Sequence, residues 1–227
     1  MDNAIVEAFR LIFTLDREVF FIAFTSLRIS LMSTGIASLF SIPLGVFLHF
    51  SSFPFKRAVI AVLSALMAVP TVVIGLLVFS FISRSGPLGP LNLLFSPKAI
   101  VLGQVFLVVP ILTSLVYSGL SKMDVRFHET LITLGAKQKD VLKASIIEAR
   151  FIIISAVLAG FGRVIGEVGV SMMLGGNIRW YTRTMTTSIA LETSKGQFEL
   201  GLSLGFILLG IALAVNALTH TLIKSEV

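Results

Sequence analysis

Long apolar runs alternate with short polar segments along this chain. The runs cover residues 26–49, 58–82, 98–119, 151–175 and 199–222. Each run has at least about 20 residues, the length that an α-helix needs to cross the hydrocarbon core of a bilayer. The pattern predicts an all-α membrane protein with about five transmembrane helices. Pro70 lies inside the second run, where it removes a backbone donor and predicts a kink.

The first 18 residues carry an amphipathic pattern instead. Glu7 and Arg10 lie on one side of a helix, and Phe9 and Phe13 lie on the other. The segment is too short to cross a bilayer, and it lacks the basic start and unbroken apolar core of a signal peptide. We therefore expect an amphipathic helix in residues 1–18, either along the membrane surface or packed against the side of the bundle.

Small and hydroxyl-bearing residues form a stripe along the first predicted span. The stripe consists of Ser26, Ser30, Ser33, Ala37 and Ser41, which share one helical face. Small side chains let two helix backbones approach each other, and hydroxyls hydrogen-bond across helices. The stripe therefore favours a helix packing surface over the lining of a pathway.

Residues 120–150 interrupt the apolar pattern with a long polar segment. Its pattern indicates two short helices outside the bilayer, with Gly135 at the turn between them. Six of the 18 Lys and Arg residues of the chain lie in this segment. Because basic residues in short loops next to spans favour the cytoplasmic side, we expect the N-terminus outside the cell and the C-terminus in the cytoplasm.

The composition narrows the class of function. Hydrophobic residues make up 56% of the 227 residues and charged residues only 13%, whereas soluble domains carry about 25% charged residues. The net charge of +6 resides mainly at the ends of the apolar runs, where it orients helices and does not indicate nucleic-acid binding. The chain has no cysteine, which excludes disulfides and thiolate metal sites. Its three histidines are isolated from one another, so no metal-ligand or nucleophile–base spacing points to an enzyme.

The polar segment ETLITLGAKQKDVLKASIIEAR resembles the EAA loop of ABC-importer permeases. Glu129 and Gly135 have the six-residue separation of that motif, and the following residues repeat its common Leu-Gly-Ala core. Thr130 and Leu131 stand in place of its two alanines. The resemblance implies that residues 120–150 form a cytoplasmic coupling loop that docks in a cleft of an ATPase subunit. The candidate coupling residues are Glu129, Leu134, Gly135, Ala136, Lys137 and Asp140.

Three further stretches resemble permeases for molybdate, tungstate and sulfate. VPTVVIGLLVFSFISRSGPLG, residues 69–89, is similar to the second core span and external loop of that group. GRVIGEVGV, residues 162–170, is similar to its ARALGEFGA signature, and residues 173–205 are similar to tungstate permeases. The resemblance covers residues 25–222 and implies the fold of a type I ABC-importer permease, with residues 1–227 as a single transmembrane domain.

The resemblance implies a permease that moves a tetrahedral oxyanion, tungstate before molybdate or sulfate, across a prokaryotic plasma (inner) membrane. It also implies a homodimer whose partners are a cytoplasmic ABC ATPase dimer, an extracytoplasmic substrate-binding protein and membrane lipid. The sequence has no G-x-x-x-x-G-K-[ST] loop, so we expect ATP and Mg on the partner ATPase and no cofactor in this chain. An ion-coupled secondary transporter is the alternative class, but the sequence shows no convincing internal repeat, and Glu167 is its one intramembrane acid.

Opposite charges lie in the middle of the fourth predicted span. Arg163 and Glu167 are four residues apart and can pair on one helical face, which offsets an insertion cost of about 2.5–3.5 kcal/mol per charge. Gly162, Gly166 and Gly169 lie on or near that face and predict the close approach of another helix, which would bury the pair. Two interpretations stay open. The pair fixes helix register, or it belongs to a gate on an oxyanion pathway formed by Arg163, Gly166, Glu167 and Gly169.

A polar segment before the last span contains a predicted short helix around residues 184–194, which Gly196 caps. Its hydroxyls and arginines suit contact with an oxyanion or with a binding protein. The candidates for such contact are Arg179, Arg183, Thr186 and Thr187. An ordinary polar loop with interfacial arginines explains the same residues, so both interpretations stay open. Trp180 and Tyr181 fit an interfacial aromatic belt.

Overall fold

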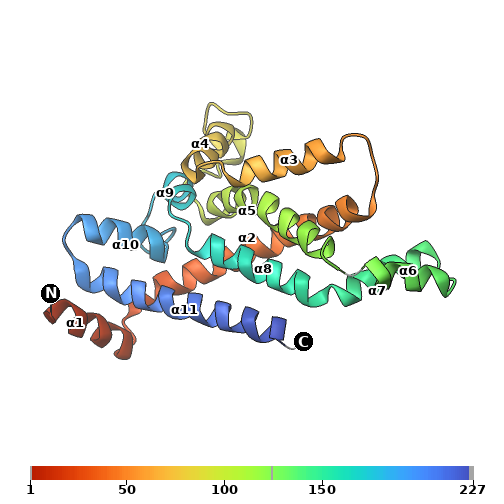
Figure 1. The fold of residues 1–227 in the computed structure, drawn as a ribbon. Coiled ribbons are helices and arrows are strands. Elements are labelled where there is room, and N and C mark those ends of the chain that lie inside the picture. The colour runs from red at the N-terminus through yellow and green to blue at the C-terminus, as the bar shows by residue number, and fades with distance from the viewer. Residues whose placement is uncertain (1, 124, 225–227) are drawn as a thin grey trace.

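The computed structural model describes residues 2–123 and 125–224, and all regular structure within these two ranges is helical (Figure 1). The helices are α1 (Asp2–Phe13), α2 (Arg17–Phe50), α3 (Lys56–Met67), α4 (Thr71–Ile82), the 3₁₀ helix η1 (Gly89–Leu91), α5 (Pro97–Leu120), α6 (Val125–Thr133), α7 (Gln138–Glu148), α8 (Arg150–Ile165), α9 (Gly169–Gly175), α10 (Met185–Ser194) and α11 (Phe198–Lys224). The all-α class predicted from the hydrophobic pattern is therefore confirmed.

Helix length and apolar composition identify the candidate membrane spans. Helices α2, α5 and α11 are each long and apolar enough to cross a bilayer. Two further candidates are bent pairs, in which α3 joins α4 and residues 139–148, nearly all of α7, join α8 at an angle of 57°. The described residues thus hold five candidate spans when each bent pair counts as one, which agrees with the predicted number.

The second span bends by 100° at Pro70, which is far more than a kink. Helix α3 ends at Met67, and α4 begins at Thr71 directly after the proline. Proline disfavours helical backbone in the residue before it and has no N–H to donate, so the helix stops and restarts here. As a result α3 packs across α5, whereas α4 packs against α9 (Figure 1).

The fourth span is broken, so the predicted continuous helix over residues 151–175 is wrong. Helix α8 ends at Ile165, and α9 begins only at Gly169. Each glycine in a helix interior costs about 1 kcal/mol relative to alanine, and this stretch contains two of them within four residues. The break puts Glu167 outside either helix and frees its side chain to cap the second one.

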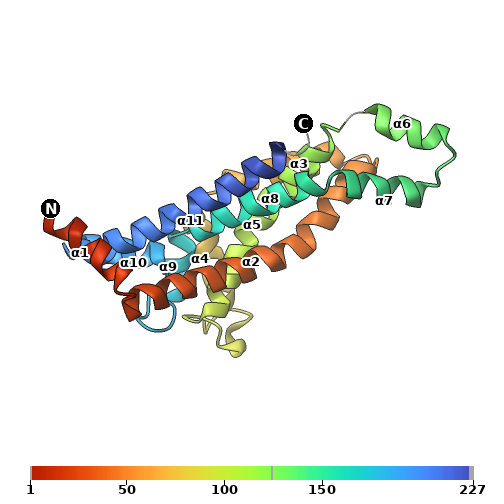
Figure 2. The same ribbon diagram turned by 90° about the horizontal axis from the view of Figure 1, so that it is seen from below.

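Helices α2 and α5 form the central pair, and α8 packs beside both (Figures 1 and 2). All members of the small-residue stripe of α2 are buried. Ser41 Oγ donates to the Val109 carbonyl of α5 at 3.1 Å. At Gly45 a Cβ atom would lie 2.8 Å from Cβ of Val116, so only glycine permits this approach of the two helices. The stripe is therefore a packing surface, as its composition predicts.

The N-terminal helix α1 packs against the side of the bundle on α11. The rings of Phe9 and Phe206 stack at 4.9 Å between centroids, and Ala4 and Ala8 are buried. Phe13 on the outer face is 81% exposed. Of the two positions expected for the amphipathic helix in residues 1–18, along the membrane surface or against the side of the bundle, the structure has the second.

Helices α6 and α7 project from the end of the molecule opposite to α1 and α10 (Figures 1 and 2). Gly135 lies at the turn between them with a φ of 79°, in the left-handed region that glycine adopts without steric cost. The predicted helix–turn–helix with Gly135 at its turn is confirmed.

Candidate functional site

Arg163 and Glu167 form the predicted ion pair. Arg163 Nη1 donates to Glu167 Oε2 at 2.7 Å. The two side chains differ sharply in burial, because that of Glu167 is 3% exposed and that of Arg163 is 41% exposed. Within the single chain only the carboxylate is enclosed, and the predicted burial of the guanidinium is not supplied by the chain's own packing.

Glu167 connects two parts of the fold besides its partner on α8. Its Oε1 accepts the backbone N–H of Val170 at 3.2 Å, which caps the first turn of α9. Its carbonyl oxygen accepts the hydroxyl of Thr186 from α10 at 2.8 Å. A change in the position of this residue would consequently be felt by α8, α9 and α10 together.

The glycines near the ion pair have different surroundings. A Cβ atom on Gly169 would lie 3.0 Å from Thr71 Oγ1, so α9 begins in close contact with α4. On Gly162 it would meet no atom within 4 Å, and on Gly166 it would meet only the Gly162 carbonyl of its own helix. The predicted close approach of another helix therefore holds at Gly169, while Gly162 and Gly166 face open space in the single chain.

An open groove of about 290 Å³ continues this uncovered face between α8 and α11. Its walls are mostly apolar and include Leu158, Ala159 and Gly162 on α8. Across the groove lie Val215 and Asn216 on α11. The exposed face of α8 thus combines a glycine-lined surface, an apolar groove and the half-exposed Arg163.

A buried chain of side-chain hydrogen bonds holds α9 in place. Ser33 Oγ on α2 donates to Gln104 Oε1 on α5 at 2.8 Å, and Gln104 Nε2 donates to Ser171 Oγ on α9 at 3.3 Å. All three side chains are at most 2% exposed. Gln104 was visible in the sequence as a polar residue inside a span, but its two partners lie on helices far away in the chain.

The hydroxyls of Thr186 and Thr187 hold the start of α10 and do not reach the surface. Thr184 and Thr187 form a capping box, and Thr187 Oγ1 also donates to Asn177 Oδ1 at 3.0 Å. Thr186 and Thr187 are 6% and 0% exposed. Their predicted contact with an anion or a binding protein is not available in this conformation, because both hydroxyls are enclosed and bonded within the chain.

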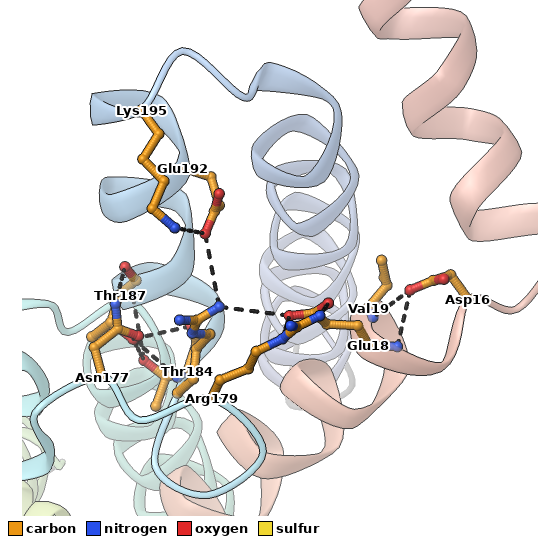
Figure 3. Close-up of polar contacts among 10 residues, drawn as sticks. Asp16, Glu18, Val19, Asn177, Arg179, Thr184, Thr187, Glu192 and Lys195 are labelled. Atoms are coloured by element: carbon orange, nitrogen blue, oxygen red, sulfur yellow. Dashed lines mark hydrogen bonds and ion pairs between the residues drawn. The ribbon is translucent and has the colours of Figure 1, made fainter.

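Arg179 and Arg183 belong to a cluster of alternating charges between the start of α2 and α10. Figure 3 shows Arg179 beside its carboxylate partner Glu18. The charge cluster consists of Glu18, Arg179, Arg183, Glu192 and Lys195. Arg179 donates to both carboxylate oxygens of Glu18, at 2.8 and 2.5 Å. Arg183 lies 3.6 Å from Glu18 and 3.7 Å from Glu192, which also pairs with Lys195 at 3.1 Å. The cluster ties the first turn of α2 to α10.

Hydrogen bonds with the Glu18 carboxylate raise the pKa of the Arg179 guanidinium above its usual value, and the charge of Glu18 adds to the effect. Asp16 positions Glu18 by capping α2, since its carboxylate accepts the N–H groups of Glu18 and Val19 (Figure 3). Sequence reasoning missed both carboxylates of the cluster. The spacing of Glu192 and Lys195 at i and i+3 was a readable signal, whereas nothing in the sequence joins Glu18 to Arg179.

The candidate coupling residues lie on the projecting α6–α7 loop. Glu129 falls within α6, and its side chain is outside the described part of the structure. At the turn, Leu134 is 78% exposed, Lys137 is the N-cap of α7, and Asp140 lies in the first turn of that helix. Ala136 beside Gly135 is half-buried. Residues 134–137 and Asp140 therefore lie at the exposed tip of the loop.

Within the described residues no three His, Asp or Glu side chains gather as a metal site requires. His49 lies at the end of α2, where its ring contacts Ser121 Oγ at 3.3 Å and the ring of Phe50. The chemistry of the site thus rests on ion pairs, hydroxyls and backbone groups.

Residues 41–225 match the family model described as "Binding-protein-dependent transport system inner membrane component". Tungstate uptake system permease protein TupB of Peptoclostridium acidaminophilum is 40% identical over 96% of this chain and 97% of its own length. TupB of Campylobacter jejuni is 38% identical over 95% of this chain and 90% of its own. Molybdenum transport system permease protein ModB of Escherichia coli is 29% identical over 74% of this chain and 80% of its own length.

The fold also matches solved structures. The crystal structure of an amino acid ABC transporter superposes with a TM-score of 0.72, covering 95% of this chain and 97% of that one at 14% identity. At that level of identity the likeness concerns the fold alone.

Proposed function

Because this chain belongs to the binding-protein-dependent transport system inner membrane components, the permease subunits of ABC importers, we propose that it translocates a tetrahedral oxyanion, tungstate in the first place. The similarity to two tungstate permeases, at 40% and 38% identity over almost the whole chain, carries the substrate assignment. Molybdate is the second candidate, since a molybdenum permease is related at 29% identity.

The chain is a transport subunit and not an enzyme, because the ATPase is a separate subunit in such importers. ATP and Mg are bound by that ATPase, which docks on the α6–α7 loop. The projection of the loop from the bundle and the exposure of Leu134 at 78% support this docking. A short helix held beyond the membrane fits a cleft on a partner and passes the partner's rigid-body motion to α5 and α8.

The permease acts as a homodimer with the pathway between its two copies. The open face of α8 supports this arrangement, because a Cβ atom on Gly162 would meet no atom within 4 Å and one on Gly166 only the Gly162 carbonyl. A cationic side chain facing lipid is costly, whereas a position beside a second copy or a water-filled pathway accommodates Arg163.

Arg163 and Glu167 then form a pathway element. The guanidinium attracts the dianion, and the adjacent carboxylate keeps the site from holding it too tightly, since a pathway must release what it binds. Because Glu167 also caps α9 and accepts a hydrogen bond from Thr186, a displacement of the pair repositions α9 and α10. The break between α8 and α9 supplies the hinge.

The permease is oriented with its N-terminus outside the cell and its C-terminus in the cytoplasm. The six basic residues of the α6–α7 region support a cytoplasmic position for that end. Helix α10, which carries Glu192 of the charge cluster, lies at the end opposite to α6 and α7 (Figure 1), so we expect that end to face the substrate-binding protein.

The test is uptake into proteoliposomes that contain this permease and its ATPase, with the substrate-binding protein supplied outside. ATP-dependent accumulation of tungstate, weakly inhibited by sulfate, is the expected result. Stronger inhibition by sulfate than by unlabelled tungstate would overturn the substrate assignment. Accumulation by the permease alone, without the ATPase, would instead establish an ion-coupled transporter.

A further inference from the structure

Trp180 lies between two arginines at the start of α2. The guanidinium carbon of Arg179 is 5.6 Å from the centroid of the indole ring, and that of Arg17 is 5.9 Å from it. The ring of Phe21 packs at 5.1 Å. In spite of these contacts Trp180 remains 43% exposed, and Tyr181 beside it is 51% exposed. Trp, Tyr and Arg are the residues most enriched at the energetic centres of protein interfaces.

The loop that carries Trp180 is held in one conformation by its own chain. Thr182 Oγ1 donates to the Gly175 carbonyl at 2.6 Å and accepts the N–H of Ile178 at 3.0 Å. Arg179 ties the loop to α2 through its bidentate bond. Trp180 itself has a φ of 61°, which is unfavourable for a bulky side chain. A loop fixed in this way loses little conformational entropy when a partner binds.

Two of the ion pairs around this loop turn their cations outward and their carboxylates inward, whereas the side chain of Arg183 is enclosed at 10% exposed. The side chain of Arg179 is 59% exposed, against 19% for Glu18. That of Lys195 is 45% exposed, against 3% for Glu192. Arg17 is exposed as well. The outer surface is therefore cationic and aromatic, which complements an acidic protein surface.

Helix α2 is longer than a bilayer requires. Its 34 residues extend about 51 Å, whereas the hydrocarbon core is about 30 Å thick. The 22 residues from Ile29 to Phe50 contain no Lys, Arg, Asp or Glu and already account for about 33 Å. The first turns of α2 therefore extend beyond the hydrocarbon, and Trp180 contacts the first of them. Phe20 on the same stretch is 40% exposed, which adds apolar area to the surface.

We propose that Arg17, Phe20, Arg179, Trp180 and Tyr181 form a docking surface for an acidic face of the substrate-binding protein. The inference rests on the proposed function, which provides that partner. The charge cluster behind the docking surface leads from α2 to α10, and Thr186 of α10 is bonded to Glu167. A partner docked at this surface is therefore linked through the charge cluster to α10, the helix that contacts Glu167 of the ion pair.

The experiment measures binding of tungstate-loaded substrate-binding protein to the complete importer in phosphatidylcholine nanodiscs, by surface plasmon resonance. Trp180→Gly removes the ring and suits the left-handed backbone, so the loop keeps its conformation. We expect its Kd to rise about tenfold or more. Phe13→Ala is the matched control, because Phe13 is an aromatic residue 81% exposed on α1, outside the docking surface.

Arg17→Glu provides a second variant that leaves the Trp180 backbone untouched. It reverses one charge, so we expect weaker binding and a smaller loss of affinity on adding salt. Thermal unfolding of each variant is measured in parallel. Weaker binding with unchanged thermal stability supports docking. A loss of binding that is no larger than the fraction of unfolded importer in that variant overturns it.

Two further results contradict the inference. Wild-type affinity in both Trp180→Gly and Arg17→Glu would show that the partner docks elsewhere. An effect found only in nanodiscs that contain phosphatidylglycerol would assign the surface to anionic lipid. If the unaltered importer binds no substrate-binding protein at all, the proposed function itself fails, and this outcome is distinguishable from the other two.

Discussion

Arg163 and Glu167 pair across the end of a helix, with Nη1 and Oε2 2.7 Å apart, although α8 already ends at Ile165. The helix break gives the carboxylate two tasks. One oxygen binds the guanidinium, and the other caps the first turn of α9 through the N–H of Val170. The ion pair and the position of α9 are consequently linked.

This link predicts different effects of two substitutions at Glu167. Glu167→Gln keeps an oxygen for the Val170 N–H, whereas Glu167→Ala removes the cap as well as the ion pair. We expect Glu167→Ala to be the less stable variant by about 1 kcal/mol, the usual value of a helix cap. Thermal unfolding in detergent measures the difference. Equal midpoints for the two variants would show that the cap contributes nothing.

The left-handed backbone of Gly135 predicts that a substitution there uncouples ATP hydrolysis from the binding protein while the permease still inserts into the membrane. Its φ of 79° is accessible to Asn but costly for a β-branched residue. Gly135→Val should therefore distort the α6–α7 turn and abolish stimulation of ATP hydrolysis by the loaded binding protein. Gly135→Asn is the control and should retain most of the stimulation. A fully stimulated Gly135→Val importer would remove the docking role of the loop.

The hydrogen bonds of Gln104 predict that its replacement increases the local opening of α9. Gln104→Leu retains the volume of the side chain but breaks the hydrogen bonds to Ser33 and Ser171. Hydrogen bonds between membrane helices are worth about 0.6 kcal/mol on average, so the global loss of stability should be small. Hydrogen exchange should nonetheless accelerate in residues 169–175 and remain unchanged in α2. Uniform acceleration throughout the bundle would contradict this role.

The different burial of the arginines in the charge cluster predicts different losses of thermal stability for Glu18→Gln and Arg179→Gln. Glu18→Gln leaves Arg183, whose side chain is 10% exposed, with Glu192 as its one remaining carboxylate in the described structure. Arg179→Gln removes a side chain that is 59% exposed, where solvent screens the pair. We therefore expect the larger decrease in thermal stability for Glu18→Gln. A larger decrease for Arg179→Gln would show that the exposed pair of Arg179 with Glu18 contributes more stability than the enclosed pair of Arg183 with Glu18.

The raised pKa of Arg179 adds a prediction about pH. A cation whose folded-state pKa is raised contributes stability at all pH values below its unfolded pKa, and loses it only as pH rises through the folded value. Both values lie far above neutrality for arginine. The thermal stability difference between wild type and Arg179→Gln should thus be constant from neutral to mildly alkaline pH. A decline over that interval would point to another titrating group.

Much of this fold follows from the sequence, because its determinants are local. The length of an apolar run fixes whether a helix can cross a bilayer, and three of the five runs form single helices long enough to do so, while the other two contribute to bent pairs. The left-handed turn at Gly135 and the short helix before Gly196 depend on neighbours within a few residues. The pairing of Arg163 with Glu167 follows from their separation of four residues.

The remaining features depend on residues that meet only in the folded chain. Glu18 and Arg179 are 161 positions apart, and Gln104 bonds to Ser33 and Ser171 at separations of 71 and 67. No periodic pattern encodes such contacts, since each is created by the packing of whole helices. The sequence by itself therefore determined which segments are helical and membrane-spanning. Only the tertiary structure decided where α8 breaks, which charges are enclosed and which cations face outward, because burial depends on the neighbours that packing supplies.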